Sequence, residues 1–331
     1  MKTLNVNLGE NSYNVYVGSG LLARANEFFD LDRRVLIVTD DGVPSEYSKK
    51  LLSLCRDGFI VTVPQGEGSK TLDTVSLLLR EMMAHSFNRH DCVVAVGGGV
   101  VGDLSGFAAS CYMRGIDFYN IPTTVLSSVD SSVGGKTGVN LDGIKNIVGA
   151  FKQPRSVIAD IELLGSLPKR QVSNGLSESV KMALTFDSDL FELFEREDPE
   201  KFLEDIICRS IELKIAVVEQ DEKEMGLRRV LNFGHTVGHG IESLGLGYYH
   251  GECVALGMLP MCTDKVRERL IPVLKKLGLP TSAEYDIDLC LDAVSHDKKA
   301  INDGISVVVV NEVGSFEITK MTVAEIKNKI Q

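Results

Sequence analysis

The sequence predicts a two-domain α/β protein, in which an N-terminal domain with an open sheet precedes a mainly helical C-terminal domain. The chain has 331 residues, enough for a sizeable core and for two domains. Short apolar runs alternate with helical patterns up to about residue 164, as they do in open α/β sheets. Beyond that point the apolar residues mostly recur at the spacing of a helix. We therefore expect domains at 1–165 and 166–331.

The N-terminal domain is predicted to begin with a β-hairpin, because 2–8 and 12–17 alternate apolar and polar residues around a turn. Short continuous apolar runs, typical of buried parallel strands, follow at 33–40, 58–64 and 91–99. Helical patterns lie between and after these strands, at 44–56, 71–86 and 103–113. This alternation of strand and helix is the basis for predicting an open sheet.

The C-terminal domain is expected to be built from helices, with Pro168 and Pro199 at the start of two of them. The helical patterns cover 169–184, 187–196, 200–221, 229–245 and 251–269. Residues 305–319 instead predict a pair of strands that turns at 311–314. A final helix is expected at 322–330.

Composition excludes several functional classes. The net charge of −11 argues against binding to nucleic acid or to an anionic membrane, since both require a basic face. No run of 18 apolar residues is present, so we expect no membrane span. Seven cysteines without a CxxC pair indicate a reducing compartment, and the N-terminus lacks the apolar core of a signal peptide. A cytoplasmic location is therefore expected.

A glycine-rich segment, 97–103 (GGGVVGD), follows a predicted strand and precedes a predicted helix. It matches G-x-G-x-x-G, which places a dinucleotide pyrophosphate at a helix N-terminus. In an ordinary Rossmann half the acidic ribose ligand follows the glycines by about 20 residues. Here the candidate acids, Asp40 and Glu67, precede them. The alternative is that the glycines only allow tight packing of the strand against the helix.

Three histidines lie within sixteen residues of one another. His235 and His239 are four residues apart and share a helix face, and His250 follows after a glycine-rich turn. Catalytic zinc commonly has three protein ligands and one open position, so two histidines and a carboxylate would suffice. The spacing does not decide between His235 and His239. The alternative is that these histidines cap helices or fill the core.

The stretch 120–150 has five glycines and no clean period, and is expected to be a connecting region. Lys136 and Lys145 add positive charge beside a permissive backbone, and Asp130 lies among hydroxyls. These groups predict a polyhydroxylated, anionic ligand. The GKT at 135–137 is not the end of a P-loop, because position 130 is Asp where that motif requires glycine. The alternative is a surface loop.

Seven segments together make the chain resemble the 3-dehydroquinate synthase family from about residue 35 to 300. They occur in the family's order: GGGVVGD, YMRG, PTTVLSSVDSSVGGKTGVN, GIKNIVGAFKQP, SESVK, LNFGHTVGH and HGE. The resemblance implies a dehydroquinate synthase-like fold, with a Rossmann-like NAD-binding domain before an all-α domain that binds metal and substrate. It also implies a homodimer.

The resemblance assigns roles to individual residues. Zinc, or cobalt in its place, is implied at Glu178, His235 and His250, so His235 is favoured over His239. NAD contacts are implied at Asp40, Glu67, Lys70, Gly98, Gly99, Asp103, Thr123, Thr124, Lys136 and Lys145. Substrate-binding or catalytic roles are implied for Asp130, Lys136, Lys145, Asn146, Lys181, Lys214, Arg228, Asn232 and His239. Arg114 matches an arginine that reaches the neighbouring subunit's substrate phosphate.

The reaction that the resemblance implies converts 3-deoxy-D-arabino-heptulosonate 7-phosphate to 3-dehydroquinate and phosphate, a step of the shikimate pathway to aromatic amino acids. The alternatives are another sugar-phosphate cyclase, such as 2-deoxy-scyllo-inosose synthase, and a metal-dependent polyol dehydrogenase. Residues 297–300 depart from the family's Asp-Lys-Lys-Asn, because Ala300 replaces the asparagine. The role of that loop is therefore left open.

Overall fold

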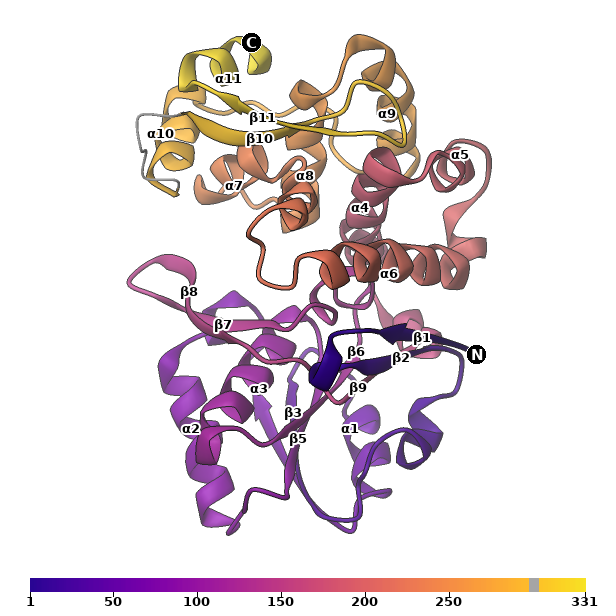
Figure 1. Cartoon of the computed structure of the whole chain (residues 1–331), viewed down its shortest axis with the longest axis vertical. Helices are drawn as coiled ribbons and strands as arrows, with labels where there is room; N and C mark the ends of the chain where they lie inside the picture. Colours follow the sequence, from indigo (N-terminus) through magenta and orange to yellow (C-terminus); the bar gives the residue numbers. More distant parts are fainter. Residues whose placement is uncertain (298–303) are drawn as a thin grey trace. The chain divides into compact units, whose positions relative to one another are not determined.

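A computed structural model describes residues 1–297 and 304–331 of the chain. These residues divide into two compact units, Met1–Leu167 and Pro168–Gln331 (Figure 1). Among the described helices, none has both the length and the apolar character that crossing a bilayer requires.

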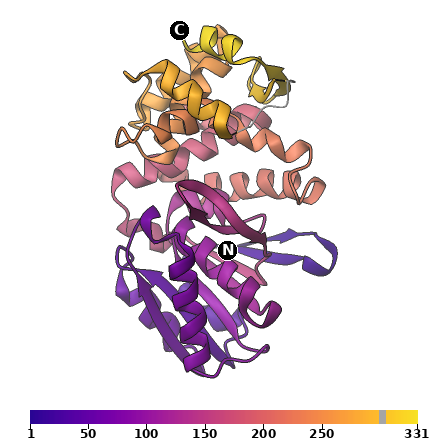
Figure 2. The ribbon, with the colours of Figure 1, turned by 90° about the vertical axis from the view of Figure 1, so that its left-hand side faces the viewer.

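The first unit is organised around a seven-stranded sheet with the order β1-β2-β9-β6-β5-β3-β4. The hairpin expected at the N-terminus is confirmed: β1 (Lys2–Val6) pairs antiparallel with β2 (Tyr13–Gly18) at one edge of the sheet (Figure 2). Every other pairing in this sheet is parallel. The remaining strands are β3 (Arg34–Asp40), β4 (Asp57–Val63), β5 (Cys92–Gly97), β6 (Asp117–Pro122) and β9 (Ser156–Asp160).

Helices cover both faces of this sheet (Figure 1). Alternate residues of a strand point to opposite faces, so β3 contributes Leu36 to one core and Ile37 to the other. Leu36 packs in the core that includes α2 (Leu72–Ala84) and α3 (Gly99–Cys111), whereas Ile37 packs in the core that includes α1 (Ser45–Leu52). The alternation of strand and helix predicted from the sequence is thereby confirmed.

Two predictions within the first unit are wrong in detail. The helix expected from residue 103 begins at Gly99, because the glycine-rich segment itself forms its first turn. The stretch 120–150 is not a plain connecting region: it contains a π-helical turn (Ser127–Ser131) and a hairpin of β7 (Lys136–Leu141) and β8 (Ile144–Phe151). Strand β9, fully buried, was not expected.

The glycines of the hairpin explain why its strands have no clear sequence period. Gly138 and Gly149 are partners in the β7–β8 register. A Cβ on Gly149 would lie 2.2 Å from the carbonyl oxygen of Thr137, and one on Gly138 would lie 2.6 Å from that of Val148. Only glycine fits at both positions, so the side-chain alternation that marks a strand is lost.

The second unit is helical, as predicted, and carries the expected strand pair of β10 (Ile305–Val309) and β11 (Glu317–Met321). Its helices are α4 (Lys169–Phe186), α5 (Ser188–Arg196), α6 (Leu203–Gln220), α7 (His235–Ser243), α8 (His250–Met258), α9 (Asp264–Lys276), α10 (Ile287–Asp297) and α11 (Val323–Ile330).

Two long helices expected in this unit are divided. The pattern at 229–245 splits into a short 3-10 helix (Leu227–Asn232) and α7, because Gly234 takes a left-handed conformation with φ of 77°. The pattern at 251–269 splits into α8 and α9 around Pro260. Helix α10 was not expected.

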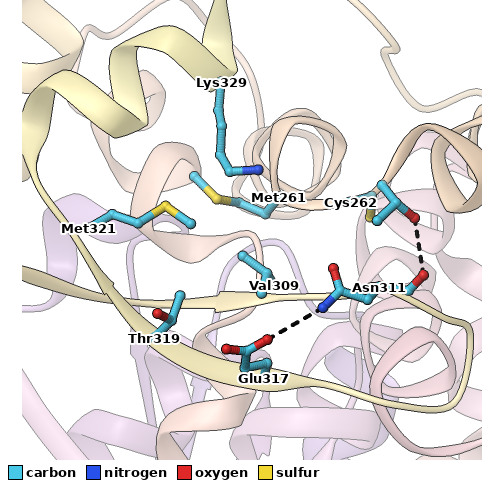
Figure 3. A pocket seen from close by; sticks show the side chains of 9 residues that line it. Met261, Cys262, Val309, Asn311, Glu317, Thr319, Met321 and Lys329 are labelled. Atoms are coloured by element: carbon cyan, nitrogen blue, oxygen red, sulfur yellow. Dashed lines mark hydrogen bonds between the residues drawn. The ribbon is translucent and has the colours of Figure 1, made fainter.

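A pocket of about 310 Å³ lies at one face of the β10–β11 pair, with Met261, Val309 and Lys329 among its lining residues (Figure 3). Of its polar side chains, Asn311 donates a hydrogen bond to Glu317 and Thr263 donates one to the carbonyl of Asn311. Some of the polar groups that line this pocket therefore form hydrogen bonds with one another.

Candidate functional site

The carboxyl edge of the sheet in the first unit has a topological switch point between β3 and β5. Strand β3 leads to β4 on one side, whereas β5 leads to β6 on the other. Ligands of open α/β sheets bind at such a point. Asp40 ends β3 there and Gly97 ends β5. The Asp40 carboxylate is buried and accepts a hydrogen bond of 2.9 Å from the Gly42 amide, and burial raises its pKa.

The glycine-rich turn after β5 lies against the threonines that follow β6. The amide of Thr123 donates to the carbonyl of Gly97 at 2.9 Å. A Cβ on Gly98 would lie 3.3 Å from the methyl of Thr124, and one on Gly99 would lie 3.1 Å from the hydroxyl of Ser131. Gly98 is the N-cap of α3 and supplies no side-chain cap. The turn thus presents a helix N-terminus, a structure that favours anions.

Lys70 links three segments of the first unit. Its buried ammonium forms an ion pair with Asp103 on α3 at 2.5 Å and donates a hydrogen bond to Asn146 on β8. Glu67, in the same loop as Lys70, accepts a hydrogen bond of 2.7 Å from Asn140. The structure thus brings together four residues that the sequence analysis assigned to NAD or substrate. Two further candidates, Lys136 and Lys145, are exposed on the hairpin, and Asp130 lies in the π-helical turn.

Arg114 is exposed on a turn that is unusual in its backbone. Met113, Arg114 and Gly115 have φ angles of 47°, 69° and 120° in succession. A residue other than glycine pays about 1–2 kcal/mol in the left-handed region. Such strain persists only where surrounding structure imposes it, and it often accompanies a functional side chain.

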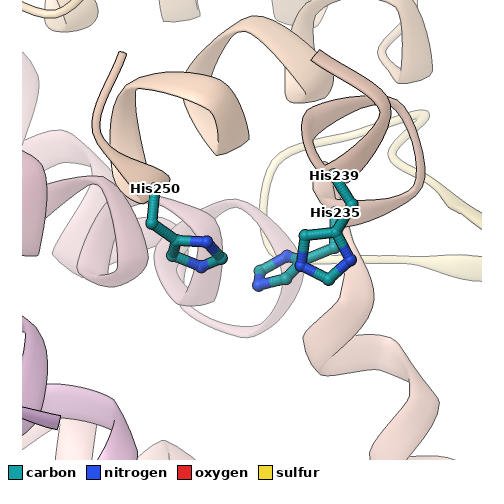
Figure 4. Close-up of side chains that lie close together, drawn as sticks. All are labelled: His235, His239 and His250. Atoms are coloured by element: carbon teal, nitrogen blue, oxygen red, sulfur yellow. The ribbon is translucent and has the colours of Figure 1, made fainter. Parts of the chain in front are cut away.

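In the second unit three helices bring their side chains to one point. His235 is the first residue of α7 and His250 the first of α8, while Glu178 lies on α4. The rings of His235, His239 and His250 converge, with candidate ligand nitrogens within 4.8 Å of one another (Figure 4). Ring centroids of His235 and His250 are 5.2 Å apart. The spacing of these residues in the sequence therefore corresponds to a real cluster.

Glu178 provides the test of whether a metal ion fits. Its side chain is fully buried, and one carboxylate oxygen lies 3.7 Å from the Nε2 atoms of both His235 and His250. Lys181 forms an ion pair with the other oxygen, yet neither oxygen accepts a hydrogen bond from any residue that the structure describes. Lys181 therefore balances charge at one oxygen of this buried carboxylate, while the oxygen that faces the two histidines has no donor among the described residues. Tetrahedral zinc separates its ligand atoms by roughly 3.3 Å, so these three donors fit a divalent ion.

Both histidines are oriented by oxygen acceptors. The Nδ1 atom of His235 lies 3.1 Å from the carbonyl oxygen of Phe233, and that of His250 lies 3.3 Å from a carboxylate oxygen of Glu242. Because these oxygens only accept, each Nδ1 carries the proton and each Nε2 keeps a lone pair toward Glu178. Metal-binding histidines are typically held in this way.

The two histidines differ in electrostatics. Burial, reinforced by the charge of Lys181, holds the pKa of His235 well below its usual value. Burial also disfavours protonation of His250, but the hydrogen bond that its Nδ1 donates to Glu242 and the charge of Glu178 outweigh burial and raise that pKa. His239, in contrast, is exposed. Of His235 and His250, His235 is thus the one more strongly held in the neutral form that ligates metals.

Glycines let the three ligand-bearing helices approach closely. A Cβ on Gly251 in α8 would lie 2.0 Å from the carbonyl oxygen of Asn174 in α4. A Cβ on Gly257 would lie 2.0 Å from the carbonyl oxygen of Gly234, which caps α7. Backbone contact of this kind leaves little freedom for the positions of Glu178, His235 and His250.

Three candidate substrate-binding cations of this unit are almost completely buried. Lys181, Lys214 and Arg228 are 1%, 4% and 2% exposed. They lie on α4, α6 and the 3-10 helix Leu227–Asn232, which pack against one another. Lysine and arginine are rarely buried without partners: Lys181 pairs with Glu178, and Arg228 donates a hydrogen bond to the carbonyl of Glu222. Asn232 donates a hydrogen bond of 2.8 Å to Glu224.

Sequence analysis missed the residues that support the histidines. Glu242 lies one turn beyond His239 on the same helix, a spacing that could have indicated it. Asn174 and Arg170, on α4, contact the first turn of α8 and had no such signal. Lys298, Lys299 and Ala300 lie outside the described residues.

Comparison with solved structures identifies the class to which this fold belongs. A 2-deoxy-scyllo-inosose synthase, solved with carbaglucose-6-phosphate, NAD+ and Co2+, superposes with a TM-score of 0.89 at 28% identity, over 99% of both chains. A 2-epi-5-epi-valiolone synthase from Streptomyces hygroscopicus subsp. jinggangensis 5008, with NAD+ and Zn2+, gives 0.88 at 28% identity, over 98% of this chain and 97% of that one. The fold is that of the sugar-phosphate cyclases.

Sequence comparisons narrow this class to one family. Models of the N-terminal and C-terminal parts of 3-dehydroquinate synthase match residues 60–174 and 175–300. The 3-dehydroquinate synthase of Alkaliphilus metalliredigens (strain QYMF) is 39% identical over 98% of this chain and 97% of its own length. The chain belongs to the 3-dehydroquinate synthase family. The main interpretation of the sequence is thereby favoured over the alternatives.

Proposed function

We propose that this chain is an enzyme that converts 3-deoxy-D-arabino-heptulosonate 7-phosphate to 3-dehydroquinate and phosphate, and that it depends on NAD and one divalent metal ion. The proposed reaction is supported by the membership of this chain in the 3-dehydroquinate synthase family. The buried carboxylate of Glu178, without a hydrogen-bond donor among the described residues, supports the metal. We further propose that 1–165 binds NAD and 166–331 binds metal and substrate.

In this proposal Glu178, His235 and His250 hold a zinc or cobalt ion. The ion would act as a Lewis acid toward oxygens of the substrate. Phe233 and Glu242 keep the two imidazoles in the ligating tautomer. Lys181 forms an ion pair with Glu178 and so places a positive charge beside the proposed ligand.

NAD would bind at the switch point of the sheet. When bound, NAD would supply reversible hydride acceptance at a substrate carbinol carbon, with no net redox change over the cycle. Gly98 and Gly99 allow the pyrophosphate to approach the N-terminus of α3, and Asp40 accepts hydrogen bonds from a ribose. The other proposed contacts are Glu67, Lys70, Asp103, Thr123, Thr124, Lys136 and Lys145.

The remaining candidates bind and orient the substrate. Lys214 and Arg228 would receive its carboxylate, since arginine suits bidentate recognition. Lys136, Asn146 and His239 would bind its phosphate, which leaves by elimination once oxidation has made the neighbouring C–H acidic. Asp130, Lys145, Lys181 and Asn232 complete the proposed set. Holding reactants in a productive geometry accounts for a large part of such catalysis.

We also propose a homodimer in which Arg114 reaches the phosphate bound by the partner subunit. Its exposure and the strained turn that presents it support this role. Mixing an inactive Arg114→Ala chain with an inactive Lys136→Ala chain tests it, because half of the sites in a heterodimer would contain both intact residues. Recovered activity is expected. Background activity in heterodimers that demonstrably form would contradict the shared site.

The reaction itself is tested by supplying the heptulosonate phosphate, NAD and zinc, and by measuring phosphate and dehydroquinate. Equal amounts of both are expected. Release of NADH in proportion to product would instead indicate a polyol dehydrogenase. Turnover of a sugar phosphate that lacks a carboxylate, with none of the heptulosonate, would indicate another cyclase.

A further inference from the structure

The first turn of α8, which begins with His250, is anchored on both sides of that residue. The amide of Tyr249 donates a hydrogen bond of 2.8 Å to the carboxylate of Glu252. The amide of Gly251 donates one of 2.7 Å to the side-chain oxygen of Asn174. The residues before and after His250 are therefore both fixed through their backbone.

Helix α4 provides both anchors. Asn174 binds Gly251 directly and is buried. Arg170 acts through Glu252, to which it donates two hydrogen bonds of 2.7 Å in a bidentate pair. The same guanidinium lies 4.0 Å from the ring centroid of Tyr249 and donates to the carbonyl of Gly247 at 2.9 Å. Arg170 thus contacts the chain on the approach to His250 as well as the cap of α8.

These two anchors share a helix face with a proposed metal ligand. Arg170, Asn174 and Glu178 succeed one another at intervals of four residues on α4. Glu178 lies 3.7 Å from the Nε2 atom of His250. One face of α4 therefore carries the proposed ligand Glu178 together with the two side chains that hold the first turn of α8, where the proposed ligand His250 lies.

We infer that Arg170 and Asn174 are positioning residues that fix His250 relative to Glu178 and so set the affinity of the metal site. This inference rests on the proposed metal site. A metal requires its ligand atoms within about 0.2 Å of their ideal distances, so a small shift of the first turn of α8 lowers affinity. Loss of outer residues that orient ligands typically weakens metal binding about 10- to 100-fold.

The second unit contains a matched control for Arg170. Arg269 on α9 forms the same kind of bidentate pair with Glu195, at 2.8 and 2.7 Å, and lies 5.2 Å from the ring centroid of Phe191. Its side chain is also partly exposed, 38% against 51% for Arg170. Arg269→Gln therefore removes the same kind of bidentate pair and aromatic contact, on a helix that carries none of the three histidines.

The experiment is a Co2+ titration of the metal-free full chain, followed by calorimetry and by the visible spectrum of the bound ion. Arg170→Gln and Asn174→Ala are each expected to bind Co2+ about 10-fold or more weakly, and Arg269→Gln to bind it like the unmodified protein. Thermal unfolding without metal shows whether Arg170→Gln and Arg269→Gln cost similar stability, as expected.

Unchanged Co2+ affinity and spectrum in folded Arg170→Gln would overturn the inference, as would an equal loss of affinity in Arg269→Gln. Because Arg170 is half exposed, this variant is expected to fold even if Asn174→Ala does not. Failure of the proposed metal site would look different: the unmodified protein would not bind Co2+, or Glu178→Gln would bind it equally well.

Discussion

In the first unit Asp40 and the turn at Gly98–Gly99, which we propose to contact NAD, lie where parallel strands end, and the turn contributes through backbone and glycine. In the second unit the candidate metal and substrate residues lie within helices, and their contribution comes from buried charge. Asp40 and the turn at Gly97–Gly99 follow strands. Glu178, Lys181 and Lys214 are instead enclosed by packed helices. A site made of buried charges depends on every partner, so the second unit is expected to be far less tolerant of change.

The largest expected effect is the loss of the metal ligand in the second unit. Glu178→Gln keeps the size of the side chain and removes its charge, so the protein should fold and lose its metal. Activity should fall about 1000-fold or more, because a metal's Lewis acidity is worth several kcal/mol at a transition state. Elemental analysis and a phosphate-release assay measure the two quantities. Full metal content in a His235→Ala/His250→Ala double variant would contradict the ligand set.

The same glycine substitution in each unit sharpens the comparison. Gly251→Ala would place a methyl 2.0 Å from the backbone of α4, and is expected to cost about 1–3 kcal/mol or more of unfolding free energy and to weaken metal binding. Gly98→Ala would place a methyl against the side chain of Thr124, 3.3 Å from its methyl and 3.7 Å from its hydroxyl. Its cost to stability should be below about 1 kcal/mol, with NAD bound about 10-fold more weakly.

Denaturant unfolding and NAD titration of both glycine variants decide this prediction. If Gly98→Ala lost more stability than Gly251→Ala, the contrast between a backbone site and a buried-charge site would be wrong.

A smaller effect concerns the choice of nucleotide in the first unit. Asp40 ends β3 and should accept the ribose hydroxyls of NAD while repelling the 2′-phosphate of NADP. NADP is expected to bind at least about 10-fold more weakly than NAD, and Asp40→Ala to reduce that difference. Equilibrium dissociation constants for both nucleotides, with and without the substitution, provide the measurement. Tighter binding of NADP by the unmodified protein would contradict the role of Asp40.

The smallest predicted effect is a pH-dependent contribution of the Asp117 carboxylate to the stability of the first unit. Burial disfavours its charge, but hydrogen bonds from Arg155 and Arg33 outweigh burial and lower its pKa. A carboxylate whose pKa is lowered by folding stabilises the folded state fully at pH values above its unfolded pKa of about 3.9. This contribution is lost as the pH falls through the pKa of the folded state. Asp117→Asn should therefore cost about 1 kcal/mol at pH 7 and progressively less below about pH 4.

Chemical unfolding of Asp117→Asn at several pH values measures this contribution. Glu27→Gln removes the exposed partner of Arg24 and serves as the control, with no measurable change expected. A cost for Asp117→Asn that stayed constant to low pH would show that the lost contacts do not depend on charge.

The contrast between the units also explains what the sequence could predict. Buried parallel strands such as β3 and β5 appear as apolar runs, and the glycine turn between β5 and α3 has its own motif, so the strands and the turn of the proposed cofactor region could be predicted. Strands β7 and β8 were not, because Gly138 and Gly149 replace the side chains that would mark them. In the second unit the histidine cluster was foreseen from its spacing.

The supports of that cluster were not foreseen, because they depend on tertiary contacts. Asn174 lies 77 residues from the amide it binds, and Arg170 lies 82 residues from Glu252. Neither contact leaves a local pattern in the sequence. The choice of His235 over His239 came from family resemblance alone, and the close approach of Glu178 to the Nε2 atom of His235 now supports it.

Turnover with limiting NAD tests the proposed reaction most directly. The metal-free chain is supplied with zinc, an excess of the heptulosonate phosphate and NAD equimolar with enzyme, and phosphate, dehydroquinate and NADH are followed together. Phosphate and dehydroquinate should form one to one, exceed NAD by at least about 100-fold, and leave no net NADH, since the hydride is returned in each cycle. Product that stops at one equivalent of NAD, or NADH that accumulates with it, would contradict the proposed function.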